Sequence, residues 1–145
     1  MRARAFVTAA VVTVLLAAGC SSSPAEEVGD WYSGGGEKQI KQMAEDAARV
    51  SEVSTRTLDV IGTACQDLAK HVPAAEALDP IPDKIAQMRW KRALTALREG
   101  ASQCTAGAAS KDEPMTGEGV RKIQIDGLHT LPDVTGRIRT VLDHK

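Results

Sequence analysis

Three cysteines are the residues of this chain whose chemistry is easiest to place. An odd number of cysteines in an exported protein leaves one outside any disulfide. If Cys20 carries a lipid, Cys65 and Cys104 remain as one pair, and the oxidising space outside the cytoplasm permits their bond. Zinc is the other role for such a pair, but neither cysteine belongs to a CxxC motif with a nearby histidine. We therefore predict a Cys65–Cys104 disulfide.

The segment before Cys20 has the three-part layout of a secretory signal. Arg2 and Arg4 precede an uncharged run of 15 residues, 5–19, that ends in small residues. Such a run spans roughly 22 Å as a helix, which is too short for a bilayer core of about 30 Å. Residues 16–20, LAAGC, are similar to the bacterial lipobox, in which the cysteine is acylated with chains such as palmitate. We expect a lipoprotein signal peptide over 1–19 and lipidation of Cys20; conventional cleavage that leaves Cys20 free is the alternative.

Lipidation of Cys20 predicts a protein anchored to the cell membrane on its extracytoplasmic face. Removal of residues 1–19 takes away Arg2 and Arg4, which leaves 16 basic and 19 acidic residues and a net charge of −3. This balance argues against nucleic acid as a partner, and it gives no electrostatic hold on anionic lipid. The anchor itself is the expected membrane contact, and an envelope protein is the expected partner.

The remaining polar residues form no recognisable catalytic or metal motif. His71, His129 and His144 have no HExxH or HxH spacing, and His129 with Asp133 is predicted to be a solvated surface pair rather than a metal site. Four carboxylates are expected on a solvated helix face, namely Glu45, Asp46, Asp59 and Asp67. The glycines at 34–36 lack the lysine and strand of a phosphate loop. We therefore expect a non-catalytic protein without a cofactor or bound metal.

The elements that position these residues begin after a predicted tether. Residues 20–36 are rich in serine and glycine, so we predict a lipidated cysteine followed by a flexible segment. Trp31 and Tyr32 interrupt it, and two roles remain open for them. They could enter the lipid interface, where aromatic rings are enriched, or pack onto an end of the domain, which we favour.

Apolar residues at gaps of three and four predict helices throughout 37–145. The first stripe indicates one long helix, with a bend expected at 51–57 because hydroxyl and β-branched residues are weak helix formers. The second stripe begins after Pro82 and Asp83. The stripes are Ile40, Met43, Ala47, Val50, Ser54, Leu58, Ile61, Cys65, Leu68 and Val72, and Ala86, Trp90, Leu94, Leu97, Ala101, Cys104 and Ala108.

The predicted disulfide constrains the turn between these helices. The helix from Asp83 to Cys104 spans roughly 31 Å, whereas Cys65 to Val72 spans only about 10 Å. We therefore predict that the first helix continues through Pro73 to about Leu78. Trp90 is expected in the core, with Arg89, Lys91 and Arg92 on a solvated face, and Ile85 and Met88 lie off the stripe, either exposed or against another element.

A third stripe follows a predicted loop at 110–119. It includes Val120, Ile123, Leu128, Leu131, Val134, Ile138 and Val141, and Pro132 is expected to kink the helix or split it. The predicted fold is all-α: a three- to four-helix up-down bundle over 37–145 with one inter-helix disulfide, after a signal peptide and a flexible tether.

Several residues together are similar to a group of small uncharacterised actinobacterial exported lipoproteins. They are Trp31 with the following GGG, Ala64 and Cys65, the PIPD of 80–83, Trp90, and Cys104 followed by Ala106 and Gly107. The resemblance covers about residues 30–108, and it implies the helical fold and not an activity.

The favoured function is a lipid-anchored, non-catalytic helical interaction module of the cell envelope. One alternative is a small-molecule or lipid carrier with an apolar cavity between its helices. Another is a phage-derived surface exclusion lipoprotein, which size and anchoring alone support.

Overall fold

The computed structural model describes residues 22–144, and every regular element among them is helical. The predicted modified residue, Cys20, lies outside this range, as does the predicted signal peptide. The elements in chain order are α1 (Pro24–Trp31), η1 (Tyr32–Gly36), α2 (Glu37–Glu52), α3 (Leu58–Glu76), α4 (Lys84–Ser110), α5 (Glu113–Lys122), η2 (Ile123–Gly127), η3 (Leu128–Thr130) and α6 (Leu131–Asp143).

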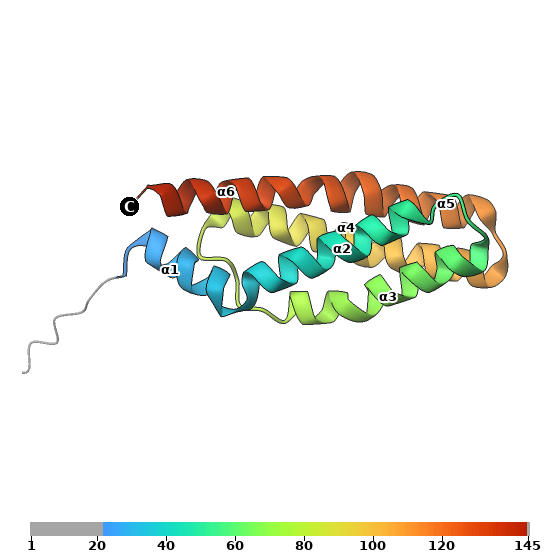
Figure 1. Ribbon diagram of the computed structural model, residues 1–145, viewed down its shortest axis with the longest axis horizontal. Helices are drawn as coiled ribbons and strands as arrows, with labels where there is room; N and C mark the ends of the chain where they lie inside the picture. The colour runs from blue at the N-terminus through green and yellow to red at the C-terminus, as the bar shows by residue number, and fades with distance from the viewer. Residues whose placement is uncertain (1–21, 145) are drawn as a thin grey trace, which may run out of the picture.

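These elements form four antiparallel columns of an elongated up-down bundle (Figure 1). The first column is α1, η1 and α2, the second is α3, the third is α4, and the fourth runs from α5 to α6. Each column packs on the next, and α1 contacts α6, which closes the bundle. The predicted all-α bundle is confirmed, with four helical columns. In the described part of the chain, no helix is both long enough and apolar enough to span a bilayer.

The predicted stripes build the core. Trp90 is buried, and Met43, Leu68, Leu97, Ile123 and Ile138 have no exposed surface or almost none. Of the first two stripes, only Ser54 and Leu58 are half-buried rather than buried. Burial of these apolar side chains against one another supplies the main favourable free energy of folding. The hydrophobic period therefore located the core correctly.

The prediction of one long helix from residue 37 is wrong, because the chain reverses at 53–57. α2 ends at Glu52, and α3 begins at Leu58 and runs antiparallel to it. Thr57 is extended, with φ −66° and ψ 153°, in a segment whose hydroxyl and β-branched residues have low helix propensity. The two halves of the first stripe face each other, and α3 also packs on α4, so the reversal buries both halves.

The predicted passage of the helix through Pro73 is confirmed. Pro73 lies inside α3, which ends at Glu76, two residues before the predicted end. Proline has no backbone N–H, so the helix lacks one hydrogen bond at Pro73. The neighbouring Val72 and Ala75 are buried in the core. α4 then starts at Lys84, and the side chain of Asp83 accepts a hydrogen bond from the amide of Ala86 as its N-cap.

The predicted flexible tether is corrected over residues 24–36, which are helical. Ser23 and Glu26 form a capping box that starts α1, and the chain continues through the π-helical turn η1 into α2. Gly35 has φ 134° there, a conformation that a side chain would disfavour. The serines and glycines predict a flexible segment, whereas Ser23 is a helix cap and the glycines form a turn without Cβ atoms.

The predicted loop at 110–119 is also wrong. α4 extends to Ser110, Lys111 takes a left-handed conformation, and α5 begins at Glu113. Asp112 caps α5 through the amide of Met115, and Pro114 lies in its first turn, which are favourable positions for both residues. Of the two glycines that indicate a loop, Gly119 faces α4 and Gly117 is exposed.

The third stripe forms the fourth column, and the predicted break near Pro132 is confirmed. η2 is a π-helical turn and η3 a short 3₁₀ turn, and Pro132 lies in the first turn of α6. A proline in that position costs no intrahelical hydrogen bond. Val120, Ile123, Leu131, Val134 and Ile138 are buried.

Candidate functional site

The first helix begins at the end of the bundle where α6 finishes (Figure 1). A surface pocket of 500 Å³ at this end is lined by Ser23, Asp83, Arg137 and His144, among others. It brings together the start of α1, the start of α4 and the last turns of α6. We call this end the N-terminal end of the bundle. Ser23, the N-cap of α1, lies there, three residues after Cys20 in the sequence.

An ion pair ties two elements together at the N-terminal end. The guanidinium of Arg137 donates through Nε to Oδ1 of Asp83 at 3.0 Å and through Nη2 to Oδ2 at 2.7 Å. This bidentate hydrogen bond lowers the pKa of Asp83 by more than burial raises it, and the hydrogen bond from the Ala86 amide lowers the pKa further. Asp83 thus caps α4 and holds α6 with the same carboxylate.

Trp31 and Tyr32 pack against the bundle core, as favoured from the sequence. The indole Nε1 of Trp31 donates to the backbone carbonyl of Asp79 at 2.6 Å. A Cβ at Gly36 would overlap the Trp31 ring, so glycine is required for this approach. The contact joins the first column to the turn between α3 and α4.

The predicted disulfide between Cys65 and Cys104 is confirmed. The two Cα atoms are 6.1 Å apart, and both residues are fully buried between α3 and α4. The bond lies inside the core, so its role here is to link two columns.

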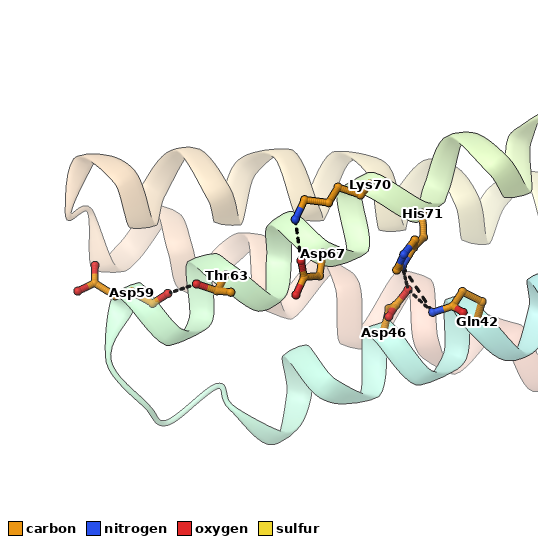
Figure 2. Close-up of polar contacts among 7 residues, drawn as sticks. All are labelled: Gln42, Asp46, Asp59, Thr63, Asp67, Lys70 and His71. Atoms are coloured by element: carbon orange, nitrogen blue, oxygen red, sulfur yellow. Dashed lines mark hydrogen bonds and ion pairs between the residues drawn. The ribbon is translucent and has the colours of Figure 1, made fainter.

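The polar contact with the most buried charge joins α2 to α3 (Figure 2). The Asp46 side chain is 5% exposed, whereas that of His71 is 47% exposed. Oδ2 of Asp46 is 2.7 Å from Nδ1 of His71 and accepts from Nε2 of Gln42 at 3.0 Å. An ionised carboxylate can only accept hydrogen bonds, so Nδ1 of His71 carries the proton. Buried carboxylates are costly unless paired in this way.

The prediction that Asp46 lies on a solvated face is therefore wrong. In a single straight helix, Asp46 and His71 would be about 37 Å apart, and only the reversal at 53–57 brings them together. The weak helix formers at 51–57 were the available signal for this contact. Asp59 is exposed on α3, and Asp67, half-buried on the same helix, pairs with Lys70 at 2.9 Å.

An aspartate–histidine pair could orient an imidazole as a general base. Such a base needs a nucleophile or a substrate proton within reach, and the only hydrogen-bond partner of His71 in residues 22–144 is Asp46. Nε2 of Gln42 lies 3.5 Å from the same ring nitrogen, but both of these atoms are donors. His129 and His144 are exposed. No group of three or more residues with metal-ligating side chains gathers anywhere in the described range. The pair is placed to join two helices.

Comparisons with known proteins identify no relative of this disulfide-linked four-column bundle. No protein-family model matches the chain, and no curated protein or solved structure matches it either.

Proposed function

We propose that this protein is a lipid-anchored, non-catalytic interaction module on the extracytoplasmic face of the cell membrane. The observation that supports it most directly is that the folded domain begins at the Ser23 cap, three residues after Cys20. With so short a connection, a lipid on Cys20 keeps the bundle against the membrane. The buried disulfide fits an oxidising location.

The distribution of side chains favours a surface function over a carrier. Large apolar residues fill the centre of the bundle, and pockets of 490 and 500 Å³ lie at the surface with charged residues among their linings. Ligand cavities for apolar molecules are lined mainly by hydrophobic side chains. We therefore assign the function to the outer faces of the helices.

The test compares the full-length chain with Cys20→Ser after expression in a host that processes lipoproteins. We expect the wild-type protein in the membrane fraction, with the mass of an acylated chain that begins at Cys20, and loss of both properties in Cys20→Ser. Ser21→Ala is the matched control and should behave as wild type. Wild-type protein that is soluble and unacylated would refute the anchor.

A further inference from the structure

The first half of α4 carries only positive charge in a protein whose net charge is −1. Residues 84–98 contain five basic and no acidic residues. Every other α-helix of the described range has an acidic residue in its first half, whereas the first acidic residue of α4 is Glu99. Three of the five cations, Lys84, Lys91 and Arg92, are exposed and have no hydrogen bond or ion pair with any residue in 22–144.

This placement opposes the stability of α4. The N-terminus of a helix is the positive end of its dipole, so cations in the first turns are unfavourable. Arg89 and Arg92 are three residues apart on one face, where like charges repel. Arg89 relieves part of this by donating to the backbone carbonyl of Asp133 at 3.0 Å. Local arrangements that cost stability are expected where a function requires them.

Two of these cations, Lys91 and Arg92, border a surface pocket of 490 Å³ between α4 and the segment formed by the end of α5 and η2. Its lining includes Met88, the three cations Lys91, Arg92 and Lys122, and the two carboxylates Glu99 and Asp126. Met88 is 65% exposed, the largest value among the exposed large hydrophobic residues. Glu99, also in the lining, already pairs with Lys122 at 2.9 Å. The pocket therefore combines an accessible apolar side chain with two unpaired cations and one further carboxylate, Asp126, which leaves the five charged side chains of its lining with a net charge of +1.

We propose that this α4 pocket binds an acidic, amphipathic segment of an envelope protein. Carboxylates of the segment pair with Lys91 and Arg92, and an apolar side chain covers Met88. Charge complementarity specifies the acidic partner, and the exposed methionine suits an adaptable apolar contact. This inference rests on the proposed anchored module and names its binding face.

The position of the pocket favours a protein over the lipid surface. α4 has 27 residues and is about 40 Å long, and the pocket lies along its side, from Met88 to Glu99, rather than at the N-terminal end. α1, at that end, carries Glu26, Glu27 and Asp30, which an anionic bilayer would repel. The α4 pocket is thus placed to contact a protein beside the bundle rather than the lipid surface.

The test places the photo-crosslinking residue p-benzoylphenylalanine at position 88, in place of Met88, in the full-length chain in its native membrane. The same residue in place of Met115, exposed on α5, is the matched position. We expect a protein adduct from position 88 whose crosslinked peptide has an excess of Asp and Glu. Lys91→Glu/Arg92→Glu should lower its yield at least about tenfold, which is the effect of 1.4 kcal/mol.

A charge-matched variant separates the local effect from net charge. Arg56→Glu/Arg139→Glu changes two exposed cations outside the pocket and should leave the adduct yield unchanged. Thermal unfolding of both variants checks that the bundle remains folded. An adduct from position 115 alone overturns the α4 pocket and leaves the anchored module standing. An adduct to lipid, or one that survives the charge reversal at 91 and 92, also overturns it, whereas failure of the Cys20→Ser fractionation refutes the anchor independently.

Discussion

Small residues decide how closely α4 and α5 approach. A Cβ atom at Gly119 would overlap the backbone nitrogen of Cys104, and one at Gly107 would lie 2.5 Å from the backbone nitrogen of Thr116. Gly100 likewise faces Ile123. These contacts bring backbones together around the disulfide, so their glycines are packing residues and not loop residues.

The Gly119 contact can be tested with a neighbouring glycine as the control. Gly119→Ala should lower the free energy of unfolding by about 1–3 kcal/mol, because the new methyl group has to push the helices apart. Gly117 lies in the same helix and is exposed, and a Cβ atom there would extend into open space. Gly117→Ala should therefore raise stability by about 0.5–1 kcal/mol. Urea denaturation of both variants measures this, and equal effects would contradict the close approach.

The Asp83–Arg137 pair predicts a change of stability in acid. Because Arg137 lowers the pKa of folded Asp83, the pair stabilises the protein above the unfolded pKa of about 3.9. That stability is lost as the pH falls through the lower, folded pKa. Asp83→Asn keeps an N-cap but removes the charge.

The difference in unfolding free energy between wild type and Asp83→Asn should therefore be positive at pH 7. It should shrink towards zero below pH ~4, as urea denaturation at several pH values would record. Asp67→Asn removes the partner of Lys70 in a surface ion pair and should have a smaller effect, because solvent screens such pairs. A difference for Asp83→Asn that does not depend on pH would contradict the role of the ion pair.

At the scale of elements, the disulfide is the covalent link between the second and third columns. Its cysteines are 39 residues apart, and closing such a loop in the unfolded chain is worth about 4 kcal/mol in the chain-entropy model. Cys65→Ala/Cys104→Ala should lower the free energy of unfolding by about this amount. Cys20→Ser is the matched control and should leave the unfolding transition in place. A loss below about 1 kcal/mol would mean that the bond does not constrain the unfolded chain.

The helical fold, the core residues and the disulfide can be predicted from the sequence, because they follow from the apolar period and from the paired cysteines. The disulfide also required the helix to pass Pro73, which periodicity alone would not indicate. Boundaries set by tertiary contact were missed. The 53–57 segment was expected to bend, but whether a weak helix bends or reverses depends on which partners its two halves bury.

The same limit explains the errors at both glycine-rich segments and at the candidate site. Residues 110–119 look like a loop by composition, yet Gly119 allows close contact with α4. The buried charge of Asp46 depends on a neighbour 25 residues away, His71, and the exposed face around Met88 depends on which side of α4 its neighbours cover. Local sequence carries neither kind of information, because both depend on how the columns pack.

At the scale of the molecule, the up-down topology gives the two ends of the bundle different neighbours. The N-terminal end gathers Ser23, Asp83 and His144. The opposite end gathers the turn between α2 and α3, including Arg56, and the start of α5. A lipid at Cys20 would therefore direct the first end to the membrane and the second away from it, and the side of α4 would remain open to a neighbour.

This orientation predicts unequal distances to the membrane for two labels. Fluorophores on His144→Cys and, separately, Arg56→Cys of the lipidated protein would report energy transfer to an acceptor lipid in reconstituted vesicles. α4 alone, with 27 residues, spans about 40 Å, so transfer should be strong from position 144 and weak from position 56. The same labels on Cys20→Ser protein should give little transfer from either position. Equal transfer from both positions of the lipidated protein would mean that the bundle lies flat on the bilayer, and the α4 pocket would then have to compete with lipid for its exposed methionine.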